Sequence, residues 1–339
     1  MGRSYLLLVI LGAGASHDSA QEIPLATDRG PWRPPLADRL FAYEAYRPLM
    51  ANYTQLLAVA HELASIPTGS TLERVMDRLQ ADAAAHPMRY AQLAAIRFYL
   101  RDLFLQTDRE WLDRTSRLTN YHPLLDQLQT WRERSGNQPV CIVTFNYDLL
   151  LEDALDSVGL DWASFDGYIA GPDWTVIKPH GSINWIRETD EPKPSGLQPL
   201  IRHAAEYKPS TRYKVARIDD IRALPDLYYP ALAIPLESGK DFECPPEHLG
   251  WLRDHLRETT EILIIGWRAT EKSFLKLLAD NIPAGLRFPL TIVCGNGTEG
   301  TATANNLAGS GVGQYAHRQI FNGGFGRFVD EKHIASLLT

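Results

Sequence analysis

Cysteine is scarce in this chain of 339 residues, and no two cysteines form a C-x-x-C pair. The three present, Cys141, Cys244 and Cys294, lie far apart in the sequence. A structural zinc site of the paired-cysteine type is therefore not expected. Such sparse usage is typical of a reduced, cytoplasmic protein, so we predict a cytoplasmic protein that needs no metal.

Long apolar runs and basic clusters are also missing. No apolar stretch approaches the ~20 residues of a membrane span. The apolar residues 5–11, followed by Ala13-Gly14-Ala15, imitate a short secretory signal, but a buried first strand that ends at a glycine turn explains them as well. With 34 basic against 41 acidic side chains, the net charge is −7. Direct partners among nucleic acids or membranes are therefore not expected.

The motifs of several enzyme classes are absent too. The sequence contains no H-E-x-x-H helix, no Walker loop and no Ser-His-Asp order. Zinc proteases, P-loop NTPases and the common serine hydrolases are therefore not favoured.

A series of short, continuously apolar segments is what the chain does contain. Continuous hydrophobicity is typical of parallel strands that are covered on both faces. Helical patterns between the segments produce a βαβ rhythm. We predict one α/β domain over 1–339, with a doubly wound, mostly parallel Rossmann-like sheet. The predicted strands are residues 5–11, 140–145, 175–178, 262–265 and 290–294.

Two long segments interrupt this rhythm. Residues 36–135 contain apolar stripes at helical spacing and predict a large helical insertion, which would form a subdomain or lid. Residues 187–217 are polar and proline-rich, and we predict a long loop that is either a mobile cover or a partner surface. The glycine-rich, aromatic segment 321–328 has no recognisable strand before it and is predicted to be a loop that closes onto the body.

Gly12-Ala13-Gly14-Ala15-Ser16 follows the first predicted strand directly. The absence of large side chains lets such a backbone approach a pyrophosphate. Its place at the first βα turn favours nucleotide binding. The third glycine of the dehydrogenase pattern is replaced by His17, which argues against a dehydrogenase. A purely structural tight turn remains the alternative.

Polar residues follow two other predicted strands. Asn146 and Asp148 come after residues 140–145, and His180 comes after 175–178. Carboxyl ends of parallel strands meet at one sheet edge, so we expect these side chains to gather there. An asparagine amide can hold a ribose or a water, an imidazole can take a proton, and Asp148 can orient neighbours or stabilise positive charge. The alternatives are a structural histidine and a cap for the helix that begins near Leu149.

The motifs GAGAS, TFNYD, KPHGS and IIGW stand in the order found in the Sir2-like family of NAD-consuming proteins. The chain resembles this family from residue 4 to about residue 294, and most closely its bacterial branch, which acts in anti-phage defence. The resemblance implies that Asn146, His180 and Asp148 are catalytic. Trp267 and Arg268 depart from the family pattern, so contacts there are left open. The residues implied to bind NAD are Gly12, Ala13, Gly14, Ala15, Ser16, Thr144, Gly181, Ser182 and Gly266. Asn296, just past the last predicted strand, is a weaker candidate for contact with the adenosine ribose of NAD.

The activity that the resemblance implies is NAD+ glycohydrolysis, in which NAD is a substrate that is cleaved to nicotinamide and ADP-ribose through an oxocarbenium-like transition state. Such an activity would be toxic if unrestrained. The resemblance therefore also implies a regulatory protein partner encoded nearby, homo- or hetero-oligomeric assembly, and a role in antiviral defence. A sensor that binds NAD or ADP-ribose without turnover is the alternative. Protein deacylation is a third reading, and the missing zinc cysteines count against it.

Overall fold

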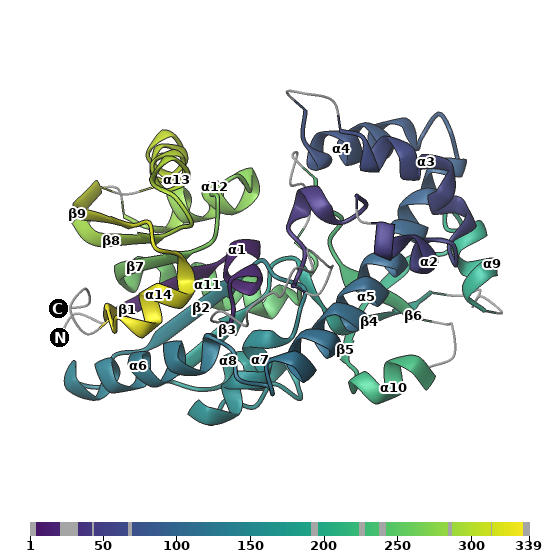
Figure 1. The fold of residues 1–339 in the computed structure, drawn as a ribbon. Coiled ribbons are helices and arrows are strands. Elements are labelled where there is room, and N and C mark those ends of the chain that lie inside the picture. The colour runs from purple at the N-terminus through teal and green to yellow at the C-terminus, as the bar shows by residue number, and fades with distance from the viewer. Residues whose placement is uncertain are drawn as a thin grey trace.

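The computed structural model describes residues 5–20, 33–42, 44–66, 70–190, 196–223, 228–236, 242–283, 287–312 and 314–334. Its main lobe is built on a six-stranded, all-parallel sheet, which confirms the predicted Rossmann-like α/β fold (Figure 1). The strands are β1 (Leu6–Leu11), β2 (Val140–Thr144), β3 (Trp174–Ile177), β7 (Thr259–Ile265), β8 (Arg287–Val293) and β9 (Gln314–Phe321).

The strand order is β3-β2-β1-β7-β8-β9. Counted along this sheet, it is 3-2-1-4-5-6, the order of dinucleotide-binding folds, whose ligands lie beyond the carboxyl ends of the strands where the order reverses. Here the reversal falls between β1 and β7. Every residue of β1 is buried, because both faces of this central strand are covered. The turns after β1, β2 and β7 therefore open at one edge of the sheet.

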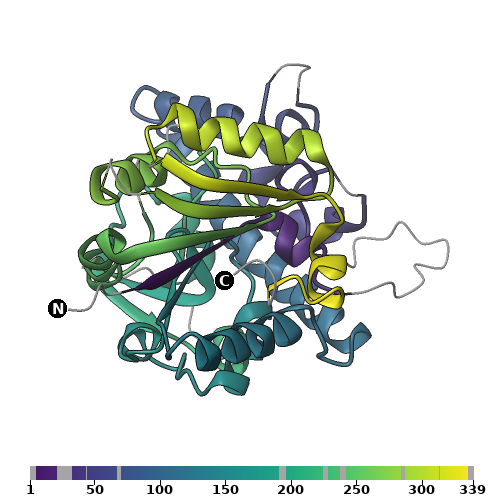
Figure 2. The ribbon, with the colours of Figure 1, turned by 90° about the vertical axis from the view of Figure 1, so that its left-hand side faces the viewer.

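Helices flank the sheet and share one hydrophobic core with it (Figure 2). In the described part of the chain, no helix is long and apolar enough to cross a membrane. The helices of this lobe are α1 (Ala13–His17), α6 (Tyr121–Arg134), α7 (Leu150–Leu155), α8 (Phe165–Ile169), α11 (Pro246–His255), α12 (Lys272–Asn281), α13 (Gly297–Gly309) and α14 (Gly324–Asp330), with 3-10 turns at Asp156–Val158 and Leu256–Glu258.

A second lobe has a hydrophobic core of its own (Figure 1). It combines helices with a three-stranded antiparallel sheet of order β5-β4-β6. The long helix α5 (Met88–Arg114) joins the lobes, since Phe98 is buried in the second core and Trp111 in the first. The other elements are 3-10 turns at Ala37–Arg39 and Glu44–Tyr46, α2 (Arg47–Met50), α3 (Thr54–Ala64), α4 (Leu72–Asp82), α9 (Leu197–Arg202), α10 (Ile218–Ala223), β4 (Gly181–Thr189), β5 (Pro209–Val215) and β6 (Tyr228–Leu232).

The architecture corrects two loop predictions. Residues 187–217 contain the end of β4, helix α9 and strand β5, while 191–195 lie outside the described residues. β5 is largely exposed, so its sequence is polar and lacks the apolar run of a buried strand. The segment 321–328 does follow a strand, the edge strand β9, and then forms α14. β9 escaped notice because its residues 318–321 are not fully buried and include arginine and glutamine.

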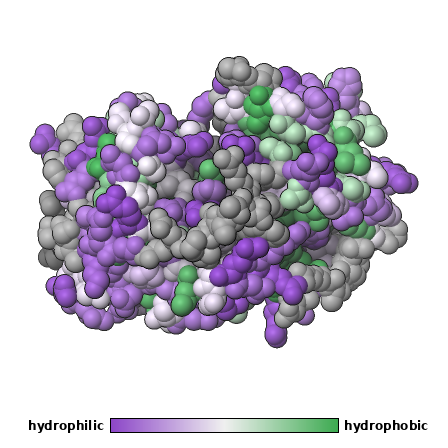
Figure 3. All heavy atoms as spheres, in the orientation of Figure 1, coloured by the Kyte–Doolittle hydropathy of each residue, from purple (hydrophilic) through white to green (hydrophobic). Residues whose placement is uncertain are grey.

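The described residues of the predicted helical insertion, 36–135, form helices and turns and no strand, although α6 packs with the sheet lobe rather than with the second lobe. The face of the molecule in Figure 3 is mainly hydrophilic, with hydrophobic side chains in small, separate groups. Small exposed apolar groups of this kind are normal on a protein surface.

Candidate functional site

The turns after β1 and β7 pack together so closely that side chains cannot fit between them. A Cβ on Gly266 would lie 2.3 Å from the Ala15 nitrogen, and one on Gly14 would lie 2.8 Å from the Gly266 Cα. A Cβ on Gly12 would lie 2.6 Å from the Gly266 carbonyl oxygen. Gly266 also has φ +62°, which favours glycine. These three glycines therefore bring two chain segments into contact at the point where the strand order reverses.

Much of the loop's hydrogen-bonding capacity is already used. The N–H groups of Gly12, Gly14 and Ala15 donate to carbonyls of the same two turns, at 2.8 to 3.1 Å. Ala13 is exposed and is the first residue of α1, where an N–H has no partner inside the helix. The loop thus offers a phosphate the backbone around Ala13 rather than a full ring of amides.

Asn146 lies directly against this loop. Its amide nitrogen is 3.0 Å from the Gly12 carbonyl oxygen, 2.8 Å from the Ser16 hydroxyl and 3.3 Å from the Tyr121 hydroxyl. A carbonyl can only accept, so the nitrogen must face Gly12 and Oδ1 must face the other way. No described residue donates to Oδ1, so this oxygen is available to a hydroxyl or a water.

Asp148 lies deeper than Asn146. Its Oδ1 accepts the Leu150 N–H at 3.3 Å, which caps the start of α7. Burial raises the pKa of Asp148, although Lys178 and the Ser16 hydroxyl oppose the shift. A carboxyl that burial drives toward its neutral form is poorly suited to stabilise developing positive charge. The geometry favours the capping alternative, and the catalytic role of Asp148 stays a prediction.

His180 stands in a tight turn that begins at Lys178, since the Gly181 N–H donates to the Lys178 carbonyl at 3.0 Å. Its ring centroid lies 4.9 Å from that of Phe145 and 6.2 Å from that of Tyr147. These two rings flank Asn146 in the sequence. The structure therefore brings the turn that carries His180 to the turn that carries Asn146.

The imidazole of His180 is partly buried, and burial lowers its pKa to about 4. The ring has no hydrogen-bond partner among the described residues. At neutral pH it is therefore uncharged, with a nitrogen lone pair that can accept a proton from a hydroxyl or water.

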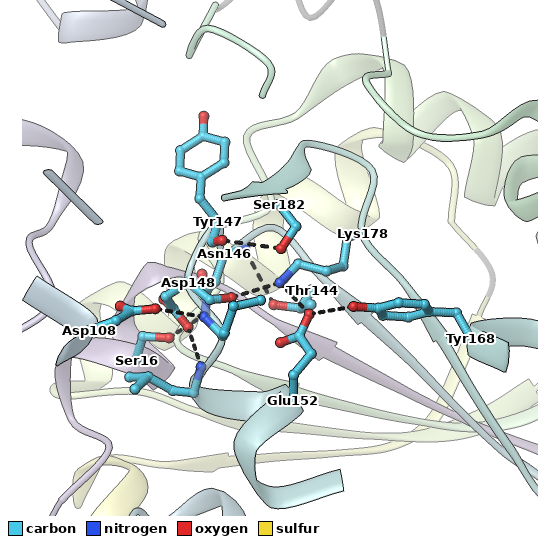
Figure 4. A network of polar contacts seen from close by, with 12 residues as sticks. Ser16, Asp108, Thr144, Asn146, Tyr147, Asp148, Glu152, Tyr168, Lys178 and Ser182 are labelled. Carbon is cyan, nitrogen blue, oxygen red and sulfur yellow. Dashed lines mark hydrogen bonds and ion pairs between the residues drawn. The ribbon is translucent and has the colours of Figure 1, made fainter. Parts of the chain in front are cut away.

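A buried polar cluster lies beneath these turns (Figure 4). The Lys178 ammonium lies 2.7 Å from Glu152 Oε1 and 2.7 Å from the Asp148 carbonyl oxygen, and both side chains of this ion pair are fully buried. The Tyr168 hydroxyl donates to the same Glu152 oxygen at 3.0 Å. Asp108, on α5, accepts the N–H of the residue after Asp148 at 2.8 Å. Burial, followed by repulsion from Asp148, raises the pKa of Asp108.

Sequence reasoning missed Lys178, Glu152, Asp108 and Tyr121 as members of the site. Only Lys178 carried a signal, because a lysine that ends an apolar strand needs a buried partner. The other three lie on helices, where nothing in the local pattern distinguishes them from ordinary helix residues.

Thr144, Gly181 and Ser182 shape the turns. The Thr144 hydroxyl accepts the Asn146 N–H at 3.2 Å, and the Ser182 hydroxyl donates to the Tyr147 carbonyl at 3.4 Å. Gly181 has φ +78°, and a Cβ there would lie 1.8 Å from the Ala231 carbonyl oxygen. Contact of these residues with NAD stays a prediction.

Trp267 and Arg268, the two residues after Gly266 that depart from the family pattern, also have contacts that can now be described. Trp267 stacks on Phe145, with centroids 5.4 Å apart and planes 7° apart, and donates to Glu271 at 2.6 Å. Arg268 is exposed. Trp267 therefore packs against Phe145, whose ring also contacts that of His180, while Arg268 faces solvent.

Asn296 stands apart from this group. It is exposed and caps α13, because its Oδ1 accepts the Glu299 N–H at 3.0 Å. Its predicted contact with the adenosine ribose is not needed to explain this placement.

We expect Asn296→Ala to lower the free energy of unfolding by about 1 kcal/mol, and Asn296→Ser to restore most of it, because serine also caps helices. Urea unfolding measures the stability, and calorimetry with NAD+ measures the affinity, which neither variant should change. A weaker NAD+ affinity in a fully stable Asn296→Ser protein would instead support the ribose contact.

A scan against protein-family models and a search of curated proteins both returned no match for this chain. Within the described ranges, no group of three or more histidine, cysteine or acidic side chains is placed to hold a metal ion.

Proposed function

We propose that this protein is an NAD+ glycohydrolase, which releases nicotinamide and ADP-ribose. One observation carries the proposal: at the carboxyl edge of a Rossmann-like sheet, beside the reversal of its strand order, Asn146 contacts the glycine-rich loop, and the neutral ring of His180 packs against Phe145, the neighbour of Asn146 in the sequence. That edge is where folds of this order bind dinucleotides.

In the proposed reaction, the pyrophosphate lies against the backbone around Ala13. The bond between the ribose carbon and the nicotinamide nitrogen breaks, and its electron pair neutralises the pyridinium. Water forms the new bond to the cationic ribose carbon, and its proton passes to His180 and then to solvent. Asn146 Oδ1 accepts a hydrogen bond from the ribose or the water and so orients the attack. A weak base suffices, because the leaving group departs neutral and the acceptor carbon is a cation.

Cleavage of this kind drains a cofactor that every cell needs, so the proposed activity requires restraint. We place this protein in antiviral defence, held inactive until a regulatory protein partner or a change in oligomeric assembly releases it. The second lobe supports this idea, since α5 runs from its core to the site and supplies Asp108.

The decisive experiment incubates the purified full chain with NAD+ over a range of protein concentrations and measures nicotinamide and ADP-ribose by chromatography. Equal amounts of both products are expected. In parallel, NAD is measured in bacteria that produce the chain, before and after phage infection. Binding of NAD+ without product under all these conditions would refute the proposal, and release that requires an acylated peptide would indicate a deacylase instead.

The pH profile tests the role of His180 separately. The neutral imidazole is the reactive form, so kcat/KM should stay flat as the pH falls through about 6.5, the usual histidine pKa, and decline only near the pKa of about 4 that burial imposes. Circular dichroism at each pH checks that the chain is folded. If kcat/KM of the folded protein instead fell with a midpoint near the usual histidine pKa, the assignment of His180 as the base would be contradicted.

A sensor that binds NAD or ADP-ribose without turnover is the second candidate. The observation that favours it is the low pKa of His180, since a ring that resists protonation is a weak base. For a sensor, calorimetry would show that the unsubstituted chain and the His180→Ala variant both bind NAD+. Neither protein, the unsubstituted chain included, would form nicotinamide.

A further inference from the structure

Lys178 carries a positive charge in the protein interior, where burying a charged group costs free energy. Its side chain is fully buried, and so is that of its partner Glu152. Desolvating such a pair costs several kcal/mol per ion, and apolar side chains of similar volume often give equal or greater stability. Stability alone therefore does not explain the pair.

The contacts of Lys178 connect the two halves of the candidate site. Its backbone carbonyl begins the turn that carries His180. Its ammonium donates to the Asp148 carbonyl, two residues beyond Asn146. One residue thus holds turns that are 30 positions apart in the sequence.

Glu152 and Tyr168 restrict the direction of this lysine. Glu152 Oε1 accepts from both the Lys178 ammonium and the Tyr168 hydroxyl. A flexible four-carbon side chain is thereby tied to two helices, α7 and α8, as Figure 4 shows for these labelled residues. An apolar residue would fill the same space but would not hold the Asp148 carbonyl.

We propose that Lys178 and Glu152 are positioning residues, whose ion pair sets the place of His180 relative to Asn146. The proposal rests on the proposed function for its effect on turnover, but its effect on the His180 ring is independent of that function. Neither residue touches the reacting atoms. A misplacement of about 1 Å at a reactive group can cost about 100-fold in rate.

The test uses the full chain with the double substitution Lys178→Met/Glu152→Gln. This variant keeps an acceptor for the Tyr168 hydroxyl and removes both charges of the pair together with the hydrogen bond to the Asp148 carbonyl. It also removes the cation that opposes the raised pKa of Asp148 and of Asp108. We expect kcat for nicotinamide release to fall by about 10- to 100-fold, while KM for NAD+ changes by less than about twofold.

A second readout follows the His180 ring by NMR during a pH titration. In the unsubstituted chain we expect the ring to titrate near pH 4, because burial lowers its pKa to about 4. In the double variant, looser packing against Phe145 and Tyr147 should raise the midpoint by at least about one pH unit, toward the usual histidine value. If the unsubstituted chain releases no nicotinamide, the proposed function fails, and this titration alone decides the positioning proposal.

The matched control is Arg132→Met, which breaks a buried arginine's ion pair with Asp173 at the opposite, amino-terminal edge of the sheet. It should lose stability without changing the His180 titration or the kcat. If the double variant does not fold, Tyr168→Phe, which removes one hydrogen bond to Glu152 and leaves both charges paired, is measured in the same way, with a smaller shift in the same direction. A folded variant whose His180 titrates as in the unsubstituted chain overturns the proposal.

Discussion

Replacing His180 with alanine is expected to lower kcat for nicotinamide release by about 100- to 10,000-fold, the range typical of a lost general base. NAD+ binding should change little, because the contacts proposed for the pyrophosphate and the ribose lie elsewhere. Chromatography of the products gives the rate, and calorimetry gives the affinity.

The control for this substitution is His255→Ala. His255 stacks on Trp251, and its Nδ1–H donates a hydrogen bond to the Trp251 carbonyl; both residues precede β7 and so lie away from the site. It should keep full turnover. Wild-type turnover in a folded His180→Ala protein would show that another group, or water alone, takes the proton.

Replacing Gly266 with alanine is expected to lower the free energy of unfolding by about 2 to 5 kcal/mol. Roughly 1 to 2 kcal/mol of this comes from the left-handed backbone, since φ is +62°. The rest, about 1 to 3 kcal/mol, comes from forcing a methyl group into a packed region, because its Cβ would lie 2.3 Å from the Ala15 nitrogen. Urea unfolding measures the loss.

Gly136→Ala is the matched control for this clash. Gly136 has φ +79°, but nothing lies within 4 Å of a Cβ built there. It should therefore lose only the backbone part, about 1 to 2 kcal/mol. Equal losses in the two variants would show that the turns after β1 and β7 can move apart. A selective loss in Gly266→Ala should be accompanied by weaker NAD+ binding, because the glycine-rich loop, against which the pyrophosphate is proposed to lie, must shift.

The five strands found in the sequence are those whose residues are buried on both faces, which makes their hydrophobicity continuous. β1 is the clearest example, since all six of its residues are buried. Two strands that escaped prediction, β5 and β9, are partly exposed, so their sequences mix polar and apolar residues without a clear period. β4 and β6 also escaped prediction, although they are mostly buried. Pairing with distant segments makes them strands, and no local pattern records that pairing.

The candidate site can be divided in the same way, into what the local sequence predicts and what only the tertiary structure decides. The local sequence predicts the reactive groups, because the glycines of the first turn, Asn146 and His180 each directly follow an apolar strand. Contacts between segments that are distant in the sequence determine the protonation and the hydrogen bonding of those groups. Tyr121 reaches Asn146 from 25 residues away, and Lys178 reaches Glu152 from 26 residues away. The low pKa of His180, the raised pKa of Asp148 and the outward oxygen of Asn146 all arise from burial and from these partners, because desolvation and hydrogen bonding depend on which side chains surround a group in space.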